Sequence, residues 1–234
     1  MLGFSDENQS TSLGIFNKAL EVVGSIPTDT ITSPYKPSQT GSEWYKAYLR
    51  ELPPIFLIDK LVTNFFNNVN WQYNPLDMVT FMEDKARWDA LPYADLSKGT
   101  QALPTETRFF PAVLFQVLAL SLLYWGLNDK SLECLKYKSD MTLEDVAREY
   151  SEAGVALSAA LAKDDLPRSG IQARFLRTLF LKTTGKVVES WHSLGETIDG
   201  ARRLQWHLDV PSDETVQRAK TIQYLWDCET CRKT

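Results

Sequence analysis

The side chains best suited to chemistry are the two histidines of the chain, His192 and His207. Both lie in residues 187–209, "VVESWHSLGETIDGARRLQWHLD". An imidazole can serve as a general base or as a metal ligand. Catalysis by such a base also requires a nucleophile beside it and a group that orients it, and no motif of that kind surrounds either histidine. We therefore expect structural roles for both histidines.

The second candidate is the CxxC sequence "CETC", Cys228–Cys231. Two cysteines at this spacing can form half of a zinc site or a redox-active dithiol. No second CxxC or closely spaced histidine pair accompanies them, and no thioredoxin-like βαβ pattern surrounds them. We expect two thiols on one turn of a final helix and no bound metal, with a redox or metal-binding pair, Cys228 and Cys231, as the alternative.

Other enzyme motifs are equally weak. A helical enzyme of the terpenoid type needs clustered carboxylates that hold Mg²⁺ against a diphosphate, and here only Asp164 and Asp165 are adjacent. The chain has no phosphate-binding glycine loop and no GxSxG or HExxH motif. The sequence thus predicts a protein that is not an enzyme and carries no cofactor. A helical small-molecule-binding protein or enzyme is the alternative.

The elements that must position these residues are helical. Hydrophobic residues make up 44% of the chain and aromatic residues 12%, which is enough for a substantial core. Apolar residues recur at helical spacing, without the sustained alternation of a strand. The predicted fold is all-α, an irregular multi-helix bundle of stacked antiparallel helix pairs. Residues 1–42 are expected to hold an N-terminal helix and a linker rich in Pro, Ser and Thr, and residues 43–234 to form the helical domain.

Start and stop signals locate the individual helices. They predict helices over 55–66 after Pro53-Pro54, from a cap at Asp77 to Trp88, from Thr142 to Leu161, over 171–183 before Gly185, and after Pro211.

Residues 187–209 are expected to form a further helix. Six apolar residues three or four apart share one face, which we expect to be buried: Val188, Trp191, Leu194, Ile198, Ala201 and Leu204. Gly195 and Gly200 would allow a neighbouring helix to approach closely. His192 precedes Glu196 by one turn, so a hydrogen bond within the helix could satisfy it. His207 lies at the helix exit, where an imidazolium would complement the helix dipole.

Residues 109–128, "FFPAVLFQVLALSLLYWGLN", contain no charge and are long enough to span a bilayer. Pro111, Gln116, Ser121 and Asn128 interrupt the segment, and no cluster of Lys or Arg flanks it. A helix buried on all sides in a protein core has the same composition. We expect a buried core helix and no membrane span.

The charge balance argues against nucleic acid as a direct partner. The chain has 25 basic and 30 acidic residues, a net charge of −5. Binding to a phosphate backbone requires a basic surface, which this composition does not indicate. An odd number of cysteines, three, and an N-terminus without a signal-peptide pattern fit a reducing compartment.

Several segments, taken in order, resemble the middle homology region of zinc binuclear cluster transcription factors, the fungal-specific transcription factor domain. "LPPIFLIDKLVTNFFNNVNWQYNPLD" (52–77) resembles its opening helix and aromatic turn, and "FFPAVLFQVLALSL" (109–122) its long buried helix. Residues 171–209 resemble its most recognisable block, with a Gln-led helix, a Trp-containing helix and a Leu-x-x-His exit. "RAKTIQYLWDCE" (218–229) is similar to the basic, aromatic helix that follows.

The resemblance implies an all-helical regulatory region that acts in the nucleus through protein partners, including a homodimer or a related transcription factor, or through a small-molecule effector. The matching family signature residues are Trp191, His192, Gly195, Ile198, Ala201, Leu204 and His207. The family's six-cysteine zinc cluster is absent, so we expect no direct binding of nucleic acid. The chain also stops at Thr234, short of the helices that usually complete the region. An excised domain, or a short cytoplasmic or nuclear decoy that pairs with a full-length relative, is the further alternative.

Overall fold

The structure is a computed structural model, and it describes residues 43–92, 95, 100–126, 130–161 and 166–204. These residues belong to one compact unit, Gln39–Thr234. The elements in chain order are α2 (Glu43–Leu49), α3 (Ile55–Asn68), the 3-10 helix η1 (Asn70–Gln72), α4 (Met78–Asp89), η2 (Thr100–Ala102), α6 (Thr105–Leu123), η3 (Lys130–Leu135), α7 (Leu143–Leu161), α8 (Arg168–Thr183) and α9 (Val187–Arg203). Because no strand occurs among the described residues, the prediction of an all-α fold is confirmed.

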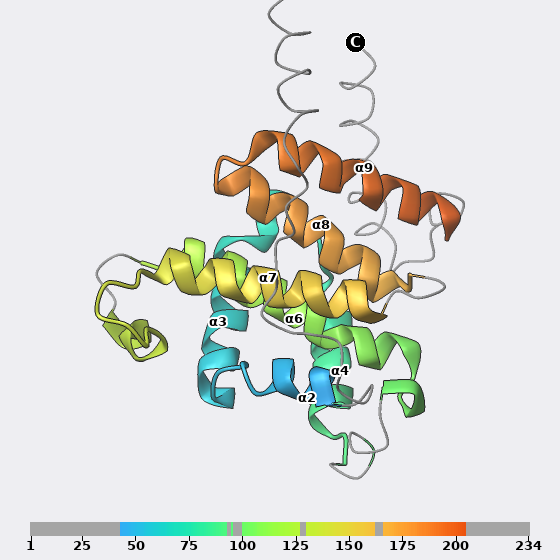
Figure 1. The fold of residues 1–234 in the computed structure, drawn as a ribbon, viewed down its shortest axis with the longest axis horizontal. Coiled ribbons are helices and arrows are strands. Elements are labelled where there is room, and N and C mark those ends of the chain that lie inside the picture. The colour runs from blue at the N-terminus through green and yellow to red at the C-terminus, as the bar shows by residue number, and fades with distance from the viewer. Residues whose placement is uncertain (1–42, 93–94, 96–99, 127–129, 162–165, 205–234) are drawn as a thin grey trace, which may run out of the picture. The chain divides into compact units, whose positions relative to one another are not determined.

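The bundle is organised around α6, which contacts α3 and α4 on one side and α7 and α8 on the other. From α6 to α9, successive helices run in alternating directions, and α9 packs on α8 (Figure 1). The stacked antiparallel pairs expected from the sequence are therefore present. The helix expected near the N-terminus and the one expected after Pro211 lie outside the described residues.

The predicted boundary signals act through specific contacts. The Asp77 carboxylate accepts a hydrogen bond from the Thr80 backbone N–H at 2.8 Å and caps α4. At the start of α7, the Thr142 hydroxyl accepts from the Asp145 N–H at 3.1 Å, while the Asp145 carboxylate accepts from the Thr142 N–H at 2.9 Å. This reciprocal pair is a capping box in which aspartate takes the place of glutamate. Gly185 has a φ of 77°, the left-handed conformation that ends α8 without a steric penalty.

Helix α6 is the buried core helix that the composition predicted. All fourteen residues from Phe109 to Leu122 are buried, and 78% of its most apolar window lies inside the protein. It is also the one helix in the described part of the chain that is long and apolar enough to cross a membrane. The helix begins at Thr105, before the uncharged segment, and ends within that segment at Leu123.

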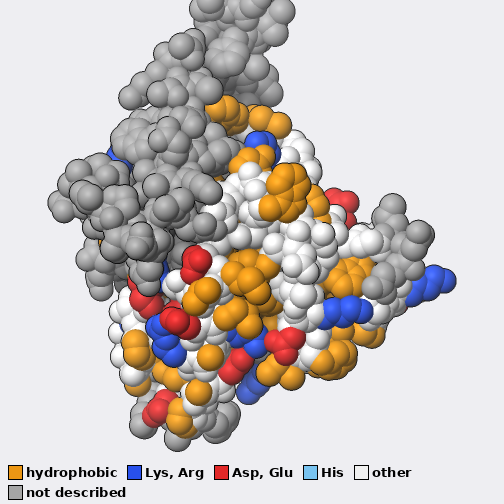
Figure 2. Space-filling model, turned by 180° about the vertical axis from the view of Figure 1, so that it is seen from behind, with side chains coloured by type: hydrophobic (Ala, Val, Ile, Leu, Met, Phe, Trp, Pro, Cys, Tyr) orange, Lys and Arg blue, Asp and Glu red, His pale blue; other side chains and the backbone are white. Residues whose placement is uncertain are grey.

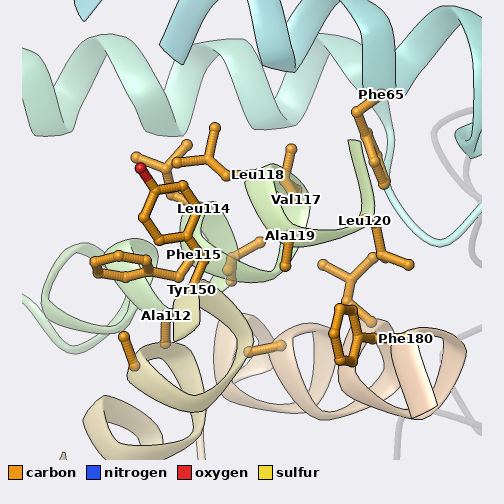
Figure 3. Packing of buried hydrophobic residues seen from close by; sticks show 14 of the residues in the cluster. Phe65, Ala112, Leu114, Phe115, Val117, Leu118, Ala119, Leu120, Tyr150 and Phe180 are labelled. Carbon is orange, nitrogen blue, oxygen red and sulfur yellow. The ribbon is translucent and has the colours of Figure 1, made fainter. Parts of the chain in front are cut away.

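Aromatic rings fill the spaces on both sides of α6. Phe115 and Tyr150 meet edge to face at 5.8 Å between α6 and α7. Phe65 of α3 and Phe180 of α8 approach α6 from other directions (Figure 3). Phe65, Phe115 and Phe180 are each at most 2% exposed. One continuous apolar core thus joins α3, α6, α7 and α8.

Buried tyrosines predict a loss of stability at alkaline pH. Tyr45 of α2 is 2% exposed and donates a hydrogen bond to the Arg108 carbonyl oxygen at 2.9 Å. Burial raises its pKa well above the ordinary value of 10, and burial also raises the pKa of Tyr150 to about 12. Above pH 10 the unfolded chain therefore releases protons that the folded chain retains, which favours unfolding.

We expect Tyr45 alone to lower the free energy of unfolding by roughly 1.4 kcal/mol for each pH unit above 10. Urea titrations at several pH values between 9 and 11, roughly the range around this reference pKa, would measure the slope. Tyr45→Phe should have the shallower slope, although it loses a hydrogen bond at every pH. Equal slopes in the two proteins would contradict this account.

Candidate ligand-binding groove

A groove of about 420 Å³ lies where α7, α8 and α9 meet. One of the two histidines of the chain, His192, is part of its lining. Its walls come from α7 and α9, its floor from α8, and Gln116 of α6 reaches it from below. The space exists because the helices present small residues there. The lining residues are Gln116, Gly154, Val155, Ser158, Ala159, Ala173, Arg174, Arg177, Leu181, Val188, Glu189, His192, Ser193 and Glu196.

A buried polar network lies beneath the groove. The Gln116 amide donates to the Ser151 carbonyl oxygen at 2.8 Å, and its carbonyl oxygen accepts from the Ser151 hydroxyl at 2.7 Å. The Arg177 guanidinium donates to the Ser151 hydroxyl at 2.7 Å and to the Glu152 carboxylate at 2.6 Å. The one amide side chain in the apolar stretch of α6 is therefore fully engaged, as a buried polar group must be. These groups have little hydrogen-bonding capacity left for a ligand.

Gly154 allows α7 to approach α6 closely at this network. A Cβ at this position would lie 2.7 Å from Gln116 Nε2 and 3.1 Å from the backbone oxygen of Ala112. The second contact is with main chain, which cannot rotate away. The close helix approach expected at Gly200 is not found there, because a Cβ at Gly200 would meet Ile171 at an ordinary 3.4 Å, whereas α7 and α6 do approach closely at Gly154.

Three polar side chains in the groove retain unused hydrogen-bonding capacity. Ser158 of α7 is 7% exposed as a residue, and its hydroxyl makes no hydrogen bond with a described residue. The Arg174 guanidinium on α8 has one counterion, Glu196, at 4.0 Å, the limit of an ion pair. His192 on α9 is exposed and makes no hydrogen bond or ion pair with a described residue. The expected bond between His192 and Glu196 is therefore wrong, because Glu196 faces Arg174.

Helix α9 is seated on α8 by small polar residues. The Ser190 hydroxyl donates to the Thr178 backbone oxygen at 3.1 Å, and the Thr178 hydroxyl donates to Ser193 Oγ at 2.9 Å. Ser190 and Thr197 are 8% and 0% exposed. Their short side chains let α9 lie close to α8, so the buried face of the helix is centred on these positions together with Leu194.

This seating corrects the predicted buried stripe. Leu194, Ile198 and Ala201 are buried as expected. Three other members of the stripe are not: Val188 is 70%, Trp191 42% and Leu204 41% exposed. Because Ser190 and Thr197 take up core positions, α9 is rotated relative to the face that hydrophobicity alone defines.

The signature residues consequently occupy different environments. Ile198 and Ala201 contact the interior, Gly195 is part-buried, and Trp191, His192 and Leu204 are exposed. The structure does not bring them together into one cluster. His207, the CxxC pair Cys228 and Cys231, and the adjacent carboxylates Asp164 and Asp165 lie outside the described residues.

Metal ligands do not gather in the part of the chain that the structure describes. No group of three or more His, Cys, Asp or Glu side chains is close enough to hold an ion there. Cys134 is an exposed free thiol.

The sequence reasoning did not identify Ser158 and Arg174. No motif marks either residue, since their relation to His192 exists only after α7, α8 and α9 pack together. The one available signal was compositional: Gly154 and Ala159 of α7 and Ala173 of α8 are small residues, which leave space between packed helices.

A second surface feature is a set of exposed apolar residues on and between α3 and α4. These residues are Ile55, Phe56, Trp71, Met78, Val79 and Met82, each at least 44% exposed. On the face seen from behind, hydrophobic side chains form several groups with Lys, Arg, Asp and Glu between them (Figure 2). Exposed hydrophobic residues scattered in this way are normal on a protein surface, unlike one broad patch.

Comparison of the chain with protein-family models, curated proteins and solved structures found no match. The resemblance to the fungal-specific transcription factor domain therefore stays a prediction.

Proposed function

We propose that this chain is a non-enzymatic helical regulatory domain that binds a small organic ligand in the groove between α7, α8 and α9. The observation that carries the proposal is the convergence of three polar side chains with unused hydrogen-bonding capacity, one from each helix, on an otherwise largely apolar space of about 420 Å³. Binding sites for small organic molecules typically have volumes of about 300–1,000 Å³ and a few placed polar groups on apolar walls.

The arrangement favours binding over catalysis. Ser158 and His192 line the same groove, but no hydrogen bond joins the hydroxyl to the imidazole. Activation of a serine as a nucleophile requires such a contact with a base, which a third group holds in place. His192 has neither among the described residues.

The resemblance supplies the regulatory setting of the proposal. A fungal transcription factor region of this type acts in the nucleus, modulates transcription and contacts protein partners without reading DNA itself. An occupied groove would restrict the movement of α7 relative to α9, and that change would reach a partner. Transcriptional regulation, nuclear localisation and partner binding are all parts of the same proposal.

A fluorescence titration with an uncharged apolar probe, N-phenyl-1-naphthylamine, tests the groove. Ala159 lies exposed in the groove wall, while the adjacent Ala160 is also exposed and does not line it. We expect saturable binding to the natural chain, loss of that binding in Ala159→Trp because the indole fills the space, and unchanged binding in Ala160→Trp. No saturable binding, or an equal loss in both variants, would overturn the proposal.

A further inference from the structure

We infer that the ligand of this groove is an amphipathic organic acid, whose carboxylate binds Arg174 while its hydrocarbon part lies along α7 and α9. The inference rests on the proposed function and adds the chemical class of the ligand. It follows from the depth at which charges lie in the groove, from the pairing of each charge, and from the position of the apolar walls.

Arg174 is the cation best placed to receive a ligand. Its side chain is 34% exposed and rises from α8, which forms the floor of the groove. The other arginine of the groove, Arg177, is 14% exposed and already donates to Ser151 and Glu152 at 2.7 and 2.6 Å. It also packs against the Phe180 ring at 5.5 Å. Arg177 is therefore committed to the fold, and Arg174 is available.

The carboxylates of the groove lie further out. Glu196 is 69% exposed and Glu189 is 59% exposed, so both are at the rim in contact with solvent. The Glu189 carboxylate pairs at 3.5 Å with the ammonium group of Lys186, a residue that does not line the groove. Glu196 stands at 4.0 Å from Arg174, too far for a strong hydrogen-bonded ion pair. A ligand carboxylate that reached the floor would form shorter bonds to Arg174 than Glu196 does.

The neighbouring polar groups can also donate to an anion. Ser158 lines the groove with 7% of the residue exposed, and its hydroxyl makes no hydrogen bond with a described residue. His192 lines the opposite wall. Arg174 can donate several N–H groups in a planar fork, which matches a carboxylate. A ligand carboxylate would thus satisfy groups that the described fold leaves unused.

The rest of the lining suits hydrocarbon. Val155 and Ala159 come from α7, Ala173 and Leu181 from α8, and Val188 from α9. Val188 is 70% exposed in spite of its apolar side chain, so a hydrocarbon chain lying against it would remove that surface from water. An ion such as inorganic phosphate would use the cation but not these walls.

Displacement of N-phenyl-1-naphthylamine by decanoate, decanol and decylamine tests the inference. The three compounds carry the same hydrocarbon chain with an anionic, a neutral and a cationic head group. We expect decanoate to displace the probe at a concentration roughly tenfold lower than decanol, since one charge-assisted hydrogen bond contributes at least that factor. Decylamine should be the weakest of the three.

Variants separate the charge from the fold. Arg174→Gln should reduce the affinity for decanoate roughly tenfold and leave that for decanol and for the probe unchanged. Arg148→Gln is the matched control, because Arg148 lies on α7, pairs with Asp145 at 3.0 Å and is absent from the groove. Glu196→Gln should increase the affinity for decanoate, because it removes the carboxylate that competes for Arg174. The Glu196 side chain is 69% exposed, so the substitution should not disturb the packing of the helices.

The outcomes distinguish the two proposals. Failure of the uncharged probe to bind would overturn the groove as a site and this inference with it. Binding of the probe with equal displacement by decanoate and decanol, or with preference for decylamine, would overturn the anionic ligand alone. Equal affinities of Arg174→Gln and Arg148→Gln for decanoate would also overturn the anionic ligand.

Discussion

Phe115→Ala is expected to lower the free energy of unfolding by about 3–5 kcal/mol, the largest effect of any single change considered for this chain. Phe115 is 0% exposed, and its ring meets Tyr150 edge to face at 5.8 Å. Removing the ring leaves a cavity between α6 and α7, and the surrounding helices cannot close it because α6 is packed on every side (Figure 3). Urea denaturation followed by circular dichroism measures the loss.

Phe56→Ala is the matched control for this change. Phe56 lies on α3 with 65% of its surface exposed, so its loss should alter the free energy of unfolding by no more than about 0.5 kcal/mol. If the two phenylalanine variants had the same stability, α6 would not be the centre of the core.

Gly154→Ala is expected to cost about 1–3 kcal/mol, although alanine is the better helix former. The added Cβ would lie 2.7 Å from Gln116 Nε2 and 3.1 Å from the Ala112 backbone oxygen, so α7 must move away from α6. In an exposed helix the same change would be stabilising by about 1 kcal/mol. The sign of the effect, measured by thermal or urea unfolding, therefore reports the helix contact directly.

Two comparisons support the interpretation of that result. Gly126→Ala should be close to neutral, because a Cβ there has nothing within 4 Å. In the double variant Gln116→Ala/Gly154→Ala, one of the close contacts is removed, so the total loss should be smaller than the sum of the two single losses. A stabilising Gly154→Ala, or strict additivity with Gln116→Ala, would contradict the packing of α7 on α6.

The sequence predicted those elements whose signals are local. The helix predicted from Thr142 to Leu161 forms as α7 (Leu143–Leu161), the Asp77 cap forms, and the uncharged run over α6 is in the core. In each of these cases the periodicity or the capping residue determines the outcome, and tertiary contacts agree with it.

The orientation of α9 could not be predicted in the same way. Ser190 and Thr197 have the side chains of surface residues, yet both are buried. Ser190 enters the interface because its hydroxyl bonds the Thr178 carbonyl oxygen of α8, and Thr197 because its hydroxyl bonds the Ser193 carbonyl oxygen of its own helix at 2.7 Å. Hydrophobic periodicity ignores such bonds and placed Trp191 in the interior. The partner of a buried hydroxyl becomes known only when the neighbouring helix is in place.

The groove was hidden from sequence reasoning for a related reason. His192 attracted notice because histidine is rare and chemically versatile, but its position beside Ser158 and Arg174 depends on the packing of three helices. Each of these residues is an ordinary surface choice for its own helix. Their common feature is unused hydrogen-bonding capacity, which is a property of the assembled fold and of no single segment.

The reciprocal bonds between Gln116 and Ser151 also have a consequence for the alignment of the bundle. A face made of alanine, glycine and leucine alone could slide along α6 by one helical turn at little cost, since many apolar seatings are nearly equivalent. Any such slip would separate the amide from its serine and leave the Gln116 amide without a partner in a dry interior. The hydrogen-bonded pair of Gln116 and Ser151 therefore selects a single register of α7 on α6. The width of the groove between α7, α8 and α9 is then fixed before a ligand binds.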